Sequence, residues 1–342
     1  MKFKILSVED YEMVHLNTPV LFIAHKGDVI TYIKDGINYK IKMPRQIPGI
    51  LRGAMCFRKL RRLFRLDKAV IMETDGNLVL FRQHEIWRYS FLNGEWNKAD
   101  IRLDCRNPMY NGVLRIQNGD LYVGEYGSFS KEGKKIYKSM DNGATWACIY
   151  TFQPEEIRHI HCLAWDNYEN MIWVFTGDKD SESKVLCFDM DFKVVEVVAC
   201  GSQKCRSCHV MFSKDSVDWI MDSPNEMVRH VKLDRKSRRI KILDSFAGPV
   251  WFAQKLSDDC AVAASVQEIG VSHTDNKLHI YASCNMSHWE EVADFQYDGW
   301  PKGYFRYGTM TFARGNSCES IYVSCEGVKK YDGKSLLCRL WE

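Results

Sequence analysis

Short apolar runs bounded by polar turn residues recur along the chain. They are rich in β-branched and aromatic residues and show no competing helical period. Examples are Asn77–Phe81, Asp120–Gly124, Met171–Phe175 and Ser320–Ser324. Runs of this length between Asn, Asp and Gly predict β-strands. The pattern therefore predicts an all-β fold.

Turn residues repeat along the chain, and each turn is followed by an aromatic or apolar segment. The turns lie at Asp35–Gly36, Asn93–Gly94, Asp141–Gly143, Asp189–Asp191, Asp234, Asn285–Ser287 and Asp332–Gly333. Their mean spacing is about 50 residues, near the length of a four-stranded propeller blade. This spacing predicts a β-propeller of seven four-stranded blades, with six blades and an elaborated end as the alternative. We expect a single domain over residues 1–342, in which a strand from Lys2 to Ser7 is a candidate to close the last blade.

The basic segment Arg58–Lys68 departs from the strand pattern. Leu60, Leu63 and Phe64 are interleaved with its Arg and Lys residues. It predicts a short helix or an exposed basic connection between blades one and two. A basic run of this kind is more often a solvated surface than a nucleic-acid site, so we expect no nucleic-acid partner.

Composition points to a well-packed protein of the reducing cytoplasm. The 342 residues are 46 % hydrophobic and include only 8 prolines, and the net charge of +3 is too small to indicate a membrane or nucleic-acid partner. The start, Met1–Asp10, has no apolar core of a signal peptide, and no apolar run is long enough to span a membrane. The 13 scattered cysteines are typical of small buried residues that stay reduced.

Two histidines are the densest candidate chemistry. His159 and His161 follow Arg158 at the start of the predicted fourth blade. Because residues two apart on a strand share a face, both imidazoles would point to the same side. Such a pair suits proton transfer, metal binding or hydrogen bonding to a sugar. The structural alternative is two polar residues satisfied at a strand end.

The neighbouring strand ends also carry polar groups. Glu125 and Tyr126 follow one predicted strand, and Asp178, Asp180 and Glu182 follow the next. The three acids suit acid–base chemistry or a divalent cation, and a solvated loop is the alternative. Later blades add further candidates for binding an anionic or hydroxyl-rich ligand such as an acidic sugar. These are Arg206, Asp222, Glu268, Arg306 and Tyr307.

The string Cys205–His209 matches C-x-x-C-H, the pattern of c-type haem attachment. Attachment needs export, for which the chain shows no signal, and the string falls where an inner strand should begin. We therefore expect reduced cysteines that happen to be close. A structural zinc site that includes Cys200 is the alternative.

The segment Ser139–Trp146 reads S-x-D-x-G-x-T-W. The Asp141 carboxylate can bond the amides of the turn, Gly143 can adopt positive φ, and Trp146 can pack between neighbouring sheets. This segment resembles the Asp-box (BNR repeat) of sialidase-like β-propellers. With its degenerate copies, the resemblance extends over roughly residues 15–342. It implies a carbohydrate-active enzyme or a non-catalytic binding propeller.

The chain departs from the sialidase pattern near its N-terminus. Arg45–Pro48 contains one residue more than the Arg-Ile-Pro motif of that family. The resemblance would place its three carboxylate-binding arginines at Arg52, Arg206 and Arg306. It would draw its Tyr–Glu pair from Tyr307 or Tyr126 with Glu125 or Glu268.

Together these features predict a propeller that cleaves a glycosidic bond in an acidic glycan or oligosaccharide. In an enzyme similar to the propeller uronate lyases, His159 or His161 with Tyr126 or Tyr307 would remove the proton, and Arg206 or Arg158 would neutralise the uronate carboxylate. A glycoside hydrolase would instead pair Glu125 with Asp178 or Glu268. We expect no cofactor apart from the candidate cation near Asp178. The alternative is a non-catalytic glycan- or protein-binding propeller.

Overall fold

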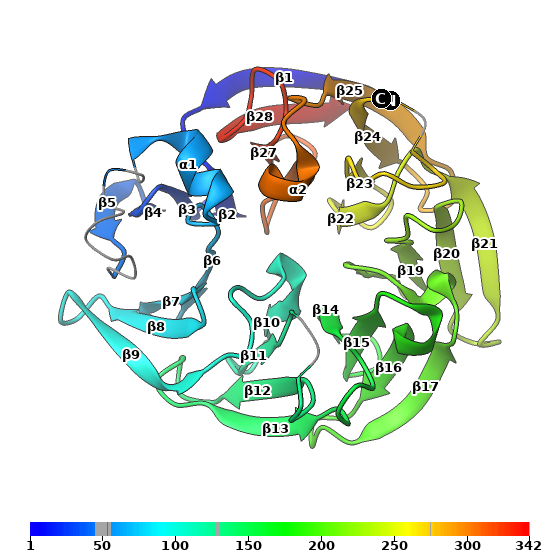
Figure 1. Cartoon of the computed structure of the whole chain (residues 1–342), viewed down its shortest axis with the longest axis horizontal. Coiled ribbons are helices and arrows are strands. Elements are labelled where there is room, and N and C mark those ends of the chain that lie inside the picture. The colour runs from blue at the N-terminus through cyan, green and yellow to red at the C-terminus, as the bar shows by residue number, and fades with distance from the viewer. Residues whose placement is uncertain (45–52, 54–55, 128–129, 274, 342) are drawn as a thin grey trace. The chain divides into compact units, whose positions relative to one another are not determined.

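The computed structural model describes residues 1–44, 53, 56–127, 130–273 and 275–341. These residues form seven four-stranded antiparallel sheets, which are the blades of a β-propeller (Figure 1). The predicted all-β fold and its seven blades are confirmed. The chain divides into two compact units, which are described separately: Met1–Lys68, Pro224–Val228 and Leu243–Glu342 form unit 1, and Ala69–Ser223 and Arg229–Ile242 form unit 2. The single-domain organisation stays a prediction.

Unit 2 carries four sheets whose strands follow one another in sequence order. They are β6 (Val70–Thr74), β7 (Asn77–Arg82), β8 (Glu85–Ser90) and β9 (Glu95–Arg102); β10 (Val113–Arg115), β11 (Leu121–Gly124), β12 (Lys135–Ser139) and β13 (Ala147–Thr151); β14 (His159–Asp166), β15 (Met171–Gly177), β16 (Lys184–Phe188) and β17 (Val194–Cys200); and β18 (Met211–Phe212), β19 (Ser216–Ile220), β20 (Arg229–Asp234) and β21 (Ile240–Ser245). The end of β21 belongs to unit 1.

Unit 1 carries three sheets, the last of which joins the two ends of the chain. They are β2 (Met13–Asn17), β3 (Leu21–Lys26), β4 (Val29–Lys34) and β5 (Ile37–Lys42); β22 (Val250–Lys255), β23 (Ala261–Ser265), β24 (Lys277–Ser283) and β25 (Glu290–Gln296); and β26 (Thr309–Phe312), β27 (Ile321–Glu326), β28 (Lys334–Trp341) and β1 (Lys2–Glu9).

The N-terminal strand β1 pairs antiparallel with β28, with Lys2 opposite Trp341 and Glu9 opposite Ser335. This pairing gives the last sheet its fourth strand. As a result, the last of the predicted turns occupies a different position within its sheet from the other six. Asp332–Gly333 joins the second and third strands of its sheet, whereas the other six turns join the third and fourth strands.

In four of the seven sheets the second strand is buried along its whole length. These strands are β7, β11, β19 and β23. A strand packed on both faces reads as a continuous apolar run, whereas an outer strand alternates. The outer strand β1 alternates exposed and half-buried residues along its length. Each unit has its own hydrophobic core, centred on residues such as Val174 in unit 2 and Val323 in unit 1.

The Asp-box-like turn between β12 and β13 is held by a network around one carboxylate. Ser139 Oγ and the Thr145 amide each donate to Asp141 Oδ1 at 2.8 Å, and the Thr145 hydroxyl donates to Oδ2 at 2.6 Å. The Gly143 amide donates to Ser139 Oγ at 2.9 Å, and Gly143 has a φ of 83°. The predicted roles of Asp141 and Gly143 are therefore confirmed.

Trp146 packs between two neighbouring sheets of unit 2, as predicted. Its Nε1 donates to the Gly143 carbonyl at 3.2 Å. Its indole ring meets Phe81 of β7 edge-on, with 5.6 Å between the ring centroids. The turn thus joins adjacent blades through an aromatic contact.

The basic segment forms a helix, α1 (Arg58–Leu63), between β5 and β6. The expectation of a solvated basic face is wrong for Arg61 and Arg62, which are buried. Arg62 pairs with Asp298, and the Arg61 guanidinium pairs with Glu12. The guanidinium groups are neutralised inside unit 1 because acids from distant parts of the sequence converge on the helix.

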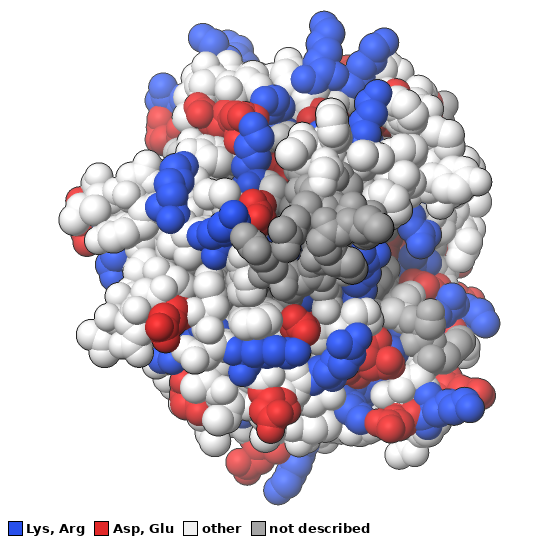
Figure 2. Space-filling model, turned by 60° about the vertical axis from the view of Figure 1, so that its left-hand side comes forward, with Lys and Arg blue, Asp and Glu red and all other residues white. Residues whose placement is uncertain are grey.

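A second short helix, α2 (Lys302–Phe305), contacts α1 in unit 1. The Arg62 guanidinium lies 5.7 Å from the Phe305 ring centroid. On the face shown in Figure 2, basic and acidic side chains are intermixed. No helix among the described residues combines the length and the apolar character that crossing a membrane requires.

Candidate functional site

Asp178 lies at the centre of a polar cluster in unit 2, just after β15. Its Oδ2 is 2.9 Å from His159 Nε2, and its Oδ1 is 3.4 Å from His161 Nε2 and 3.3 Å from Arg206 Nη2. The two histidines lie on β14, which pairs with β15 so that His159 is opposite Gly177. This pairing places the end of β15 beside the start of β14. The structure thus brings together four residues that the sequence singled out.

His159 is held on both sides of its ring. The Gly127 amide donates to Nδ1 at 3.2 Å, so the ring proton is assigned to Nε2, which donates to Asp178. Tyr126 stacks on the imidazole with 4.2 Å between ring centroids and 19° between planes. Burial lowers the pKa of His159, although the hydrogen bond to Asp178 and its charge oppose the shift. The imidazole is therefore neutral near pH 7.

The acidity of Asp178 follows from its partners. Burial alone would raise the pKa of Asp178, but hydrogen bonds from His159 and His161 and the charge of Arg206 hold it far below its usual range. Asp178 is therefore an ionised group that orients both imidazoles. It is a poor base and a poor acid near pH 7.

Behind Asp178 lies a more deeply buried layer. Asp222, which follows β19, accepts from Arg206 Nε at 3.4 Å and from the Cys208 thiol at 3.2 Å, both at Oδ2. His161 Nδ1 lies 3.8 Å from the same oxygen and has no hydrogen-bond partner among the described residues. His161, Cys208 and Asp222 are each no more than 2 % exposed.

These three side chains have the spacing of metal ligands. One ligand atom from each of His161, Cys208 and Asp222 lies within 4.8 Å of the other two. The sequence raised Cys208 only as part of a structural zinc site with Cys200 and did not place it with His161 and Asp222. The structure takes one cysteine of the C-x-x-C-H string into the cluster and places Cys205 outside it. The 13 cysteines, all of which lie in the described ranges, form no disulfide.

Arg158 and the acids of the following loop surround the cluster more loosely. Arg158 is 3.8 Å from Asp178 Oδ2 and 3.5 Å from Glu182 Oε1, and its side chain is 30 % exposed. Asp180 Oδ1 accepts from the Gln203 amide at 2.7 Å. Asp178 and Glu182 thus share Arg158, whereas the Asp180 carboxylate bonds to Gln203. Among the described residues, the three acids are not a group with metal-ligand spacing.

Glu125 uses its carboxylate for the backbone. The Asp104 amide donates to Oε1 at 2.7 Å and the Lys135 amide donates to Oε2 at 3.0 Å. Burial raises the pKa of Glu125, although the two amides oppose the shift. Both carboxylate oxygens of Glu125 therefore accept hydrogen bonds from the backbone, and Glu125 stabilises the local structure.

The remaining candidates belong to unit 1. Glu268 follows β23 and is half-buried, and Arg306 is exposed with a φ of 60° after α2. Tyr307 meets Trp251 edge-on with 5.9 Å between ring centroids. Arg45–Pro48 and Arg52 lie outside the described residues.

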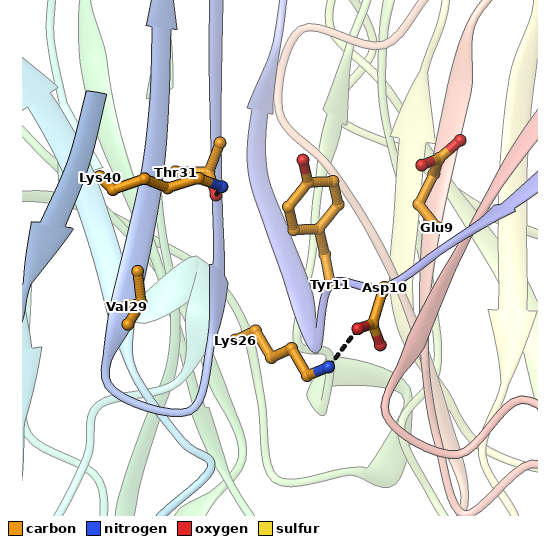
Figure 3. Close-up of a pocket in the computed structure, with 7 residues that line it drawn as sticks. All are labelled: Glu9, Asp10, Tyr11, Lys26, Val29, Thr31 and Lys40. Carbon is orange, nitrogen blue, oxygen red and sulfur yellow. Dashed lines mark hydrogen bonds and ion pairs between the residues drawn. The ribbon is translucent and has the colours of Figure 1, made fainter. Parts of the chain in front are cut away.

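A pocket of about 430 Å³ also lies in unit 1, beside β3, β4 and β5 (Figure 3). None of the residues predicted from the sequence lines it; the lining is Glu9, Asp10, Tyr11, Lys26, Val29, Thr31 and Lys40. Lys26 crosses it to pair with Asp10. The pocket brings mixed charges together but no proton-transfer pair, so the Asp178 cluster remains the better candidate site.

Comparison with known proteins adds little on function. No family model matches the chain. No curated protein matches it either. Among solved structures, a protein proposed to be TolB from Agrobacterium tumefaciens is similar over 67 % of this chain and 81 % of its own, with 12 % identity and a TM-score of 0.45.

Proposed function

We propose that the chain is a carbohydrate-active propeller of the Asp-box type that cleaves an acidic glycan at the Asp178 cluster. The hydrogen bonds around Asp141 support the resemblance to the BNR repeat. The observation that carries the functional proposal is the convergence of two imidazoles and a guanidinium on Asp178. Histidine, tyrosine and arginine can supply the base, the acid and the carboxylate-binding cation of a uronate-directed reaction.

The geometry favours elimination over hydrolysis. Hydrolysis needs one protonated and one ionised carboxyl group facing the scissile bond. Here Glu125 is bonded to two backbone amides, and Asp178 is ionised and shared by His159, His161 and Arg206. Neither is placed to work as half of such a pair.

In the proposed elimination, neutral His159 takes the proton α to the uronate carboxylate. The electron pair of that C–H bond forms the new carbon–carbon double bond, and the bond to the glycosidic oxygen breaks. Burial and the charge of Asp178 raise the pKa of Tyr126, so its hydroxyl stays protonated and can give its proton to the leaving oxygen. Asp178 stabilises the imidazolium, and half-exposed Arg158 pairs with the uronate carboxylate. His159 must first release the 3.2 Å bond from Gly127, a rearrangement that substrate binding commonly brings about.

One observation favours non-catalytic binding as the second candidate. Both nitrogens of His159 have partners, Gly127 and Asp178, so the resting ring is fixed as a recognition surface. Tyr126 and Arg158 would then supply stacking and charge to a bound glycan.

The test is activity on a panel of acidic oligosaccharides, followed by the ultraviolet absorbance of unsaturated uronates and by reducing ends. We expect absorbance to rise with wild-type protein and to fall at least about 100-fold in His159→Ala and in Tyr126→Phe. Tyr168→Phe, which removes an exposed hydroxyl at the β14–β15 turn, is the matched control. Reducing ends without absorbance would support hydrolysis and reject the elimination. Glycan binding without any cleavage would support the second candidate.

A further inference from the structure

From the inner layer of the cluster, we infer a zinc-type metal site formed by His161 Nδ1, Cys208 Sγ and an Asp222 carboxylate oxygen. Nitrogen, thiolate and carboxylate ligands together suit Zn²⁺ better than Mg²⁺ or Ca²⁺, which prefer oxygen alone. The inference is independent of the proposed elimination, in which neither His161 nor Cys208 takes part.

The spacing of the ligand atoms fits one small ion. Cys208 Sγ is 3.2 Å from Asp222 Oδ2, and His161 Nδ1 is 3.8 Å from the same oxygen. Ligands held about 2.0–2.3 Å from a tetrahedral zinc lie about 3.3–3.7 Å from one another. Only small side-chain adjustments therefore separate the described geometry from a coordinated one.

His161 is oriented as a metal ligand. Its Nε2 lies 3.4 Å from Asp178 Oδ1, whereas its Nδ1 has no hydrogen-bond partner among the described residues although the side chain is buried. A metal-bound histidine usually donates its other ring N–H to a carboxylate, which fixes the tautomer and turns the lone pair to the metal. Asp178 would be that carboxylate. The arrangement explains why a buried polar nitrogen is left without a partner.

The charges of the cluster also fit. Asp178 and Asp222 are each in contact with Arg206, and Arg158 contacts both Asp178 and Glu182. These three carboxylates therefore face two guanidinium groups, and one negative charge remains. A divalent ion that displaces the Cys208 thiol proton brings two positive charges and creates one thiolate, so the cluster becomes neutral. Arg206 therefore does not prevent binding. Three protein ligands leave a fourth position for water.

The sequence positions give a sharp test with a built-in control. Cys205 and Cys208 are both buried and belong to the same C-x-x-C-H string, but only Cys208 lies in the ligand group. Cys205→Ser should therefore behave like wild type, whereas Cys208→Ser should lose the site. Asp178→Asn should weaken binding about 10–100-fold through the orientation of His161.

The experiment is titration of the metal-free full chain with Co²⁺ and Zn²⁺, combined with elemental analysis of the loaded protein. We expect one ion per chain, displacement of Co²⁺ by Zn²⁺, and a thiolate-to-cobalt charge-transfer band that is absent from Cys208→Ser and present in Cys205→Ser. Thermal melts of the variants show that they are folded, and Asp222→Asn provides a second test if Cys208→Ser is not. Absence of stoichiometric binding to folded wild type, or an unchanged band in Cys208→Ser, would overturn the inference. Metal content is read without substrate, so its outcome is independent of the glycan assay.

Discussion

His15 Nε2 and His25 Nδ1 lie 2.8 Å apart in unit 1, and both side chains are almost fully buried. His25 Nε2 also lies 3.2 Å from the Asp67 carbonyl oxygen, which can only accept. His25 therefore donates from Nε2, and a single proton is shared between its Nδ1 and His15 Nε2. Burial, reinforced by His25 and by Arg314, lowers the pKa of His15 well below 6.5. The His15 ring is thus built into unit 1 as a neutral group.

This pair predicts an acid-sensitive fold. The unfolded chain takes up a proton at His15 near pH 6.5 and the folded chain does not, so stability is lost as the pH falls below about 6.5. The urea midpoint should be nearly constant between about pH 7 and 8 and fall below that range. His15→Gln, which keeps a donor but cannot be protonated, should flatten the decline. His288→Gln, at an exposed histidine, should leave it unchanged, and an undiminished slope in His15→Gln would assign the effect to other groups.

Alanine substitutions at two turn glycines allow the cost of backbone strain and the cost of a steric clash to be measured separately. Gly143 and Gly36 have φ values of 83° and 81°, but a Cβ on Gly143 would lie 2.5 Å from Val79 Cγ2, whereas one on Gly36 would meet nothing within 4 Å. Gly36→Ala should cost about 1–2 kcal/mol in unfolding free energy from strain alone. Gly143→Ala should cost about 1–3 kcal/mol more, because Val79 must move. Equal losses in urea titrations would mean that the turn at Gly143 relaxes without disturbing the neighbouring strand.

The buried cationic helix should be sensitive to loss of a single charge. Arg62 has 2 % side-chain exposure and pairs with Asp298, with Glu326 at 3.6 Å and with Asp332 at 3.7 Å. Arg62→Ala would leave these carboxylates without their shared partner, so we expect a loss of about 3–5 kcal/mol in unfolding free energy.

The matched control for Arg62 is an exposed ion pair. Arg339 pairs with Glu319 at 2.6 Å, and both side chains are at least half exposed. Arg339→Ala should change the unfolding free energy by no more than about 1 kcal/mol. Similar losses in both variants would show that burial does not set the strength of the Arg62 interactions.

The fold could be predicted from the sequence because its signals are local. A buried second strand such as β7 reads as an uninterrupted apolar run, and Asp141 and Gly143 mark a turn through their own hydrogen bonds and dihedral angles. The environment of α1 could not be predicted in this way. The partner of Arg62, Asp298, is 236 residues away, and no local pattern shows that a basic helix meets acids brought by other strands.

The candidate site could also be predicted only where local signals place its residues. His159, His161 and Asp178 follow from the pairing of two consecutive strands, which brings a strand start and a strand end together. The C-x-x-C-H string associates Cys208 with Cys205 and Cys200, its neighbours in the sequence, whereas only the fold brings it to His161 and Asp222. Glu125 occupies a strand end as Asp178 does, but the sequence does not show which way a carboxylate turns. That direction separates a group of the polar cluster from a structural one.

The different tasks of Glu125 and Asp178 can be measured. Glu125 accepts two backbone amides, from Asp104 and Lys135, and is 1 % exposed, so Glu125→Ala would leave two donors without partners. We expect a loss of about 2–6 kcal/mol in unfolding free energy, since each of the two buried unsatisfied groups costs about 1–3 kcal/mol. Asp178 is partly exposed and orients side chains, so Asp178→Asn should cost less stability but change glycan turnover and metal affinity. Full stability of Glu125→Ala with abolished glycan cleavage would instead return Glu125 to the reaction, as the sequence predicts. Urea titration and the glycan assay on the same preparations decide between these outcomes.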